Sequence, residues 1–107
     1  MKTHGLTAVS LACLIVCAGP VAAAPFSNGD PKAGEKHFNE KNCNACHARK
    51  FGGTGDKMFT RADRRVTTPE KLAGQIAACN TNLNSGWFPE DEESVAAFLN
   101  QKFYKFK

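Results

Sequence analysis

The chain has 107 residues, the usual size of one domain. It carries 14 basic and 10 acidic residues, for a formal net charge of +4. A charge this small argues against a nucleic-acid-binding protein, because such proteins concentrate many basic residues on one surface. The sequence contains no internal repeat and no strand-like alternation of apolar and polar residues, which favours a small helical domain.

The first segment, residues 1–24, is predicted to be a secretory signal peptide. Lys2 supplies the positive charge, residues 6–16 form an apolar run, and residues 21–24 offer small side chains for cleavage after residue 23 or 24. The alternative is a retained anchor, but the run is short for crossing a bilayer. We therefore expect no membrane span in the mature chain, residues 25–107, and a periplasmic location.

The mature chain begins with a predicted helix. Asp30 can cap its first turn, and Pro31 suits the first helical position. Gly34 removes a side chain at a point where another helix could approach closely. His37 and Phe38 follow on the same helix, shortly before the most informative stretch of the chain.

That stretch is Cys43-Asn44-Ala45-Cys46-His47, which has the C-x-x-C-H spacing of a covalent haem attachment site. Two thiols about one helical turn apart can add to the two vinyl groups of one porphyrin, and His47 can then bind the iron. A zinc site would want a second ligand pair, and a thioredoxin-like pair would want alternating strands and helices. We predict one haem c, held by Cys43, Cys46 and His47.

The segment after the motif, residues 48–66, is predicted to be irregular. The glycines at 52, 53 and 55 indicate a tight path, which could follow the haem edge. Arg61, Arg64 and Arg65 form a small basic cluster. Three interpretations remain open: the cluster pairs with the haem propionates, docks redox partner proteins, or is an ordinary solvated loop.

Two further helices are predicted. Thr68-Pro69-Glu70 is a helix start, Leu72 and Ile76 follow at helical spacing, and the helix should end within residues 80–84. The last helix starts at Pro89, with acidic residues 90–93 at the positive end of its dipole. Its apolar stripe consists of Val95, Phe98, Leu99, Phe103 and Phe106. The whole pattern predicts an all-α fold.

Residues 34–38 followed by the haem motif resemble the opening of a class I cytochrome c, and residues 90–99 resemble the C-terminal helix of that family. The resemblance covers most of residues 30–105. It implies a small helical domain wrapped around one covalent haem, with single-electron transfer as its activity.

The C-terminal half is more similar to the cytochrome c-double-prime and sphaeroides haem protein group. The similarity rests on Cys79-Asn80, Pro89 and Ala97-Phe98-Leu99. In that group a His or Asn before the Cys ligates the iron weakly, and the Cys forms a disulfide across the following loop. Here Ala78 and Trp87 occupy those two positions, so neither feature carries over.

The sixth iron ligand is therefore left open by the sequence. The candidates are Met58, Cys79 and His37; Cys79 could instead be an inert thiol or form an intermolecular disulfide. No acid–base pair for substrate chemistry is evident, so we expect an electron carrier and not an enzyme. The alternative is a haem protein whose open or displaceable sixth site binds a small gas or oxidant.

Overall fold

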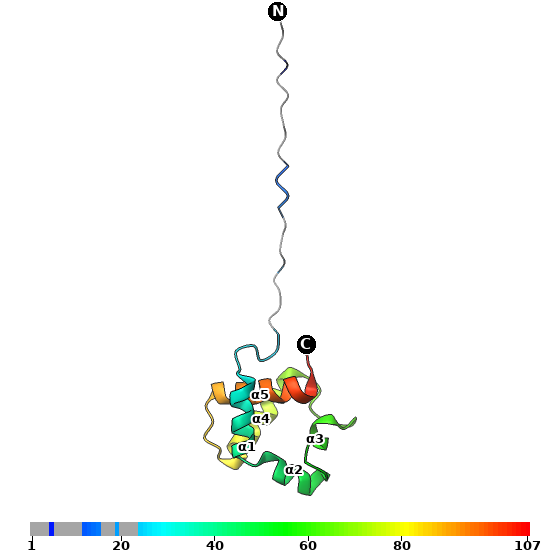
Figure 1. Ribbon diagram of the computed structural model, residues 1–107, viewed down its shortest axis with the longest axis vertical. Coiled ribbons are helices and arrows are strands. Elements are labelled where there is room, and N and C mark those ends of the chain that lie inside the picture. Colours follow the sequence, from blue (N-terminus) through cyan, green and yellow to red (C-terminus); the bar gives the residue numbers. More distant parts are fainter. Residues whose placement is uncertain (1–4, 6–11, 16–18, 20–23) are drawn as a thin grey trace, which may run out of the picture.

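The computed structural model describes residues 5, 12–15, 19 and 24–107, so most of the predicted signal peptide lies outside the described residues. The described part of the chain is helical and contains no strand, which confirms the all-α prediction. Its elements are α1 (Pro31–Glu40), α2 (Cys43–Phe51), α3 (Lys57–Thr60), α4 (Pro69–Leu83), α5 (Pro89–Leu99) and a π-helical turn, η1 (Asn100–Tyr104) (Figure 1). Among these helices none has the length and apolar character needed to cross a membrane.

The helix starts follow local capping chemistry, as the sequence predicted. The Asp30 side chain accepts a hydrogen bond from the backbone N–H of Lys32 at 3.0 Å, just before α1. Thr68 does the same for the N–H of Lys71 at 3.2 Å, just before α4. The α4 helix ends at Leu83, within the expected residues 80–84, and the next residue, Asn84, has a left-handed φ of 50°, which is common at helix C-termini.

The crossing of α1 over α5 is the closest contact between helices (Figure 1). Both Gly34 and Phe38 are buried there. A Cβ on Gly34 would overlap the backbone carbonyl of Ser94, and the ring of Phe38 packs on that of Phe98 with centroids 5.6 Å apart. The close helix approach expected at Gly34 is confirmed, and the atoms nearest to it are backbone atoms of α5.

The hydrophobic core extends from this crossing to the C-terminal turn. In the predicted stripe Val95, Phe98 and Leu99 lie on α5 and are buried. The prediction of one continuous stripe was wrong at its end, because Phe103 lies on η1 and Phe106 lies beyond it; both are half-buried against the core. The sequence missed two buried aromatic residues, Phe59 and Tyr104. The Phe59 ring stacks on that of Phe103 at 4.9 Å and meets Tyr104 edge-on at 6.0 Å, which connects α3 to η1.

The prediction that residues 48–66 are irregular was wrong in part. The motif helix α2 continues through Phe51, and the four residues of α3 form a further helical turn. The reason is local: Ala48, Arg49 and Lys50 all favour helix. The helix ends only where Gly52 adopts a φ of 82°, with its N–H bonded to the carbonyl of Ala48 at 2.8 Å.

Candidate functional site

A cavity of about 760 Å³ lies between α2, α3, α4 and α5, within the general size range of ligand sites. We call it the α2–α4 cavity. Cys43, Cys46 and His47 line it from α2, while Leu72, Ile76 and Cys79 line it from α4. The residues of the C-x-x-C-H motif therefore lie on one wall of a space large enough to hold a ligand.

The two motif cysteines are placed by the start of α2. Because the helix begins at Cys43, Cys46 lies one turn further along the same helix. Both cysteines are free thiols; Cys43 is half-buried and Cys46 is exposed. Burial, and secondarily the nearby Cys79, raises the pKa of the Cys43 thiol. The Sγ of Cys46 accepts a hydrogen bond from Nη2 of Arg49 at 3.1 Å.

The His47 imidazole is held by aromatic neighbours. Its ring lies 5.4 Å from Phe59 and 6.5 Å from Phe38, centroid to centroid. Burial lowers the pKa of His47, which favours the neutral imidazole that metals bind. Its Nδ1 is buried and has no hydrogen-bond partner among the described residues, which fits a position where a bound group would supply the partner.

The glycine-rich segment supports the motif helix from outside the cavity. Gly55 has a φ of 93°, and a Cβ there would lie 2.7 Å from the carbonyl oxygen of Asn44 and 3.0 Å from Cβ of His47. The tight path predicted from the glycines is thus observed. What lies against it is the first turn of α2, which carries the motif, and only a residue without a side chain fits so close to that backbone.

The three arginines of the basic cluster all line the cavity, but they differ in their partners and in their exposure. Arg61 pairs with the exposed carboxylate of Asp63 through two hydrogen bonds of 2.7 Å. Arg64 lies over the ring of Tyr104 at 6.0 Å, and its Nε is buried without a hydrogen-bond partner in the described residues. A buried N–H donor of a cation that lacks an acceptor fits an anionic group in the cavity. Arg65 is exposed.

The structure separates the three candidates for a sixth ligand. Met58 and Cys79 both line the α2–α4 cavity, and Sγ of Cys79 accepts a hydrogen bond from Nε2 of Gln75 at 3.3 Å. His37 points elsewhere: its Nε2 lies 3.2 Å from Oδ1 of Asp91, and its ring packs against Trp87. Met58 and Cys79 are therefore brought to the same cavity as His47, and His37 is not.

One wall of the cavity was not predicted from the sequence. The face of α4 that lines it carries Leu72, Gln75, Ile76, Cys79, Asn82 and Leu83. These residues repeat at intervals of three and four, the spacing of one helix face. The sequence indicates Leu72 and Ile76 by their helical spacing and Cys79 as a candidate ligand, but these predictions do not join them into one face. The repeat was a signal that could have identified the whole face.

No family model, no curated protein and no solved structure matches this chain. No cluster of three or more His, Cys, Asp or Glu side chains within the described residues could hold a metal ion. The assignment of the cavity therefore depends on its own chemistry. Two free thiols, a half-buried imidazole, a guanidinium whose Nε is buried without a partner among the described residues, and apolar walls are a set of groups that fits a haem.

Proposed function

We propose that this protein is a class I-like monohaem cytochrome c of the periplasm that passes single electrons between redox partners. The observation that carries the proposal is the placement of Cys43, Cys46 and His47 on one wall of the α2–α4 cavity. A chance C-x-x-C-H sequence would have no reason to line a space of ligand size.

Each part of the group has residues suited to it. Cys43 and Cys46 would carry the two thioether bonds, His47 would bind the iron, and Arg64 would pair with a propionate carboxylate. Bound haem iron would supply the chemistry, which is the gain and loss of one electron. The protein's part is to pack the imidazole against the rings of Phe38 and Phe59 and to surround the group with apolar side chains.

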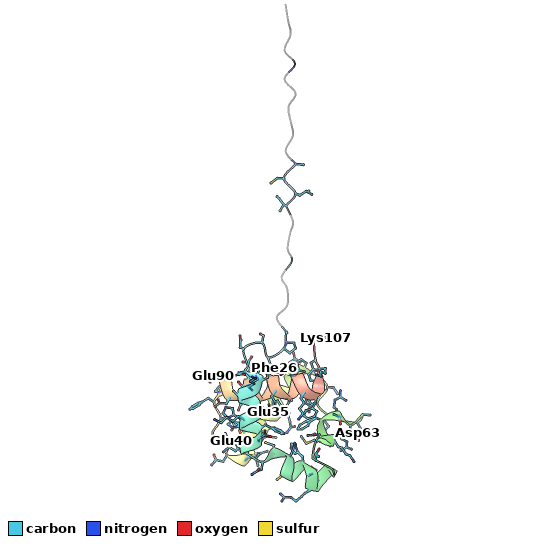
Figure 2. All side chains as sticks on the ribbon, in the orientation of Figure 1. Phe26, Glu35, Glu40, Asp63, Glu90 and Lys107 are labelled. Atoms are coloured by element: carbon cyan, nitrogen blue, oxygen red, sulfur yellow. The ribbon has the colours of Figure 1, made fainter. Side chains whose placement is uncertain are left out.

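A partner with an acidic face fits the surroundings of the cavity. Residues 41–65 hold seven basic and two acidic residues, and five of the basic ones line the cavity: Lys41, Lys50, Arg61, Arg64 and Arg65. In Figure 2 the label of Asp63 marks the place of this basic segment. The labelled acids Glu35, Glu40 and Glu90 lie away from it, on the α1 and α5 side of the molecule. This uneven distribution of charge would orient the protein as it meets a redox partner.

A second function is favoured by the polar groups on the α4 wall. Gln75, Cys79 and Asn82 line the cavity within an otherwise apolar helix face. Such groups could bind a small molecule at the iron, if the sixth position is open or its ligand is displaced. The alternative proposal is therefore a haem protein that binds a small gas or oxidant.

Carbon monoxide binding by the ferrous protein distinguishes the two functions. For an electron carrier we expect a low-spin spectrum and slow or absent binding, because a resident donor must first leave the iron. The donor is expected to be Met58 or Cys79, which both line the cavity. The alanine variant that removes the donor should bind carbon monoxide fast. His37→Ala is the control for the identity of the donor and should keep the low-spin spectrum, because His37 faces Asp91 and does not line the cavity.

The opposite result would favour the second function. Rapid, stoichiometric carbon monoxide binding by wild-type protein with a high-spin ferrous spectrum would contradict a stable sixth ligand. Loss of the low-spin spectrum in His37→Ala alone would contradict the placement of the donor in the α2–α4 cavity.

A further inference from the structure

The loop between α4 and α5 turns one large side chain toward the cavity. Asn84 and Gly86 take left-handed backbone conformations, with φ of 50° and 74°, which reverse the chain. Phe88, at the end of the loop, is 71% exposed, whereas Trp87 is half-buried, lines the α2–α4 cavity and packs against the core. Trp87 is therefore the residue of this loop that borders the cavity.

One side chain holds the backbone of Trp87. The Oδ1 of Asn80 accepts a hydrogen bond from the N–H of Trp87 at 3.1 Å, and its Nδ2 donates to the carbonyl oxygen of Trp87 at 3.0 Å. The same Nδ2 donates to Oε1 of Glu92 at 2.6 Å. Only an amide offers a donor and an acceptor together at this length, so Asp or Ala cannot reproduce the arrangement.

The outer side of Trp87 is backed by two helices. Its ring lies 6.0 Å from that of His37 on α1, and His37 is paired with Asp91 on α5. The second carboxylate oxygen of Asp91 accepts the backbone N–H of Phe88 at 3.0 Å. Trp87 thus lies between this support and the cavity. The two hydrogen bonds from Asn80 hold its backbone in position.

We infer that Asn80 is a positioning residue that holds Trp87 over the α4–α5 edge of the cavity and so limits the access of water to the haem. The inference rests on the proposed function. Solvent exposure and local polarity set the reduction potential of a haem, because water stabilises the more highly charged ferric state. Asn80 therefore acts on the potential through Trp87, without touching the haem.

The test uses the full-length haem-loaded protein and the variant Asn80→Asp. This change removes both Nδ2 donations and places a carboxylate against Glu92. Trp87 is the only tryptophan in the chain, so its emission reports its position directly. A nearby haem quenches tryptophan emission by energy transfer. We expect a several-fold rise in emission, a shift of its maximum to longer wavelength, and a lower midpoint potential.

Two further variants keep the result interpretable. Asn39→Asp makes the same chemical change at an exposed position on α1 and should match the wild type in emission and potential. Trp87→Ala removes the side chain that covers the cavity edge, so it should lower the potential by itself. The backbone groups that bond to Asn80 remain in this variant. Adding the uncharged change Asn80→Ala to Trp87→Ala should lower the potential no further, because the two residues act as one unit.

The outcomes separate this inference from the proposed function. Acid-acetone extraction is applied first, and wild-type protein that loses its haem overturns the proposed function together with the inference. Protein that keeps its haem while Asn80→Asp shows wild-type emission and potential overturns the inference alone. If Asn80→Asp does not fold, a wild-type potential in Trp87→Ala overturns it, and a lowered potential supports it.

Discussion

Changing both Cys43 and Cys46 to alanine should abolish covalent haem attachment, whereas wild-type protein should keep its haem through denaturation and acid-acetone extraction. Each thioether bond uses one of these two thiols. Each single variant should therefore keep one bond and give a distinct pyridine haemochrome spectrum. Folding should suffer as well, because a domain of this length has a marginal core and the haem would fill a cavity of about 760 Å³.

Cys79 provides the matched control for the attachment experiment. It is also a free thiol that lines the α2–α4 cavity, but it lies on α4 and outside the motif. Cys79→Ala should retain both thioether bonds in full. Extraction of haem from the wild type would disprove the central proposal, and loss of attachment in Cys79→Ala would show that the motif is not the attachment site by itself.

Gly34→Ala should destabilise the fold more than an ordinary helix substitution does. A Cβ at this position would overlap the carbonyl of Ser94 and lie 2.8 Å from the backbone nitrogen of Val95. Backbone atoms cannot move aside as a flexible side chain can, so α1 and α5 would have to separate. Overpacking of a core typically costs ~1–3 kcal/mol, and we expect the upper part of that range or beyond. Chemical denaturation of the haem-loaded protein measures the change.

Gly74 is the control for this second prediction. It also lies inside a helix, α4, but a Cβ there would have nothing within 4 Å. Gly74→Ala should therefore raise the free energy of unfolding by about 0.5–1 kcal/mol, because glycine weakens a helix interior relative to alanine. Equal denaturation midpoints for Gly34→Ala and wild type would show that α1 and α5 do not approach each other this closely at Gly34.

The parts of the molecule that the sequence predicted are those set by local chemistry. The helix starts at Asp30 and Thr68 and the helix end within residues 80–84 each depend on a few neighbouring residues, and all were observed. The close helix approach at Gly34 could be predicted because the absence of a side chain is visible in the sequence. The motif residues themselves are contiguous, so the sequence alone indicates their chemistry.

The tertiary structure decided which groups share the cavity. The sequence could not rank Met58, Cys79 and His37, because their distances from His47 depend on how separate helices pack. The fold places His37 against Asp91 and turns Cys79 into the cavity, although both residues lie on helices that the sequence predicted. The hold of Asn80 on Trp87 was equally hidden, because it joins a helix to the loop that follows it through side-chain hydrogen bonds. Periodicity defines the faces of a helix, but only packing against distant residues determines what each face meets.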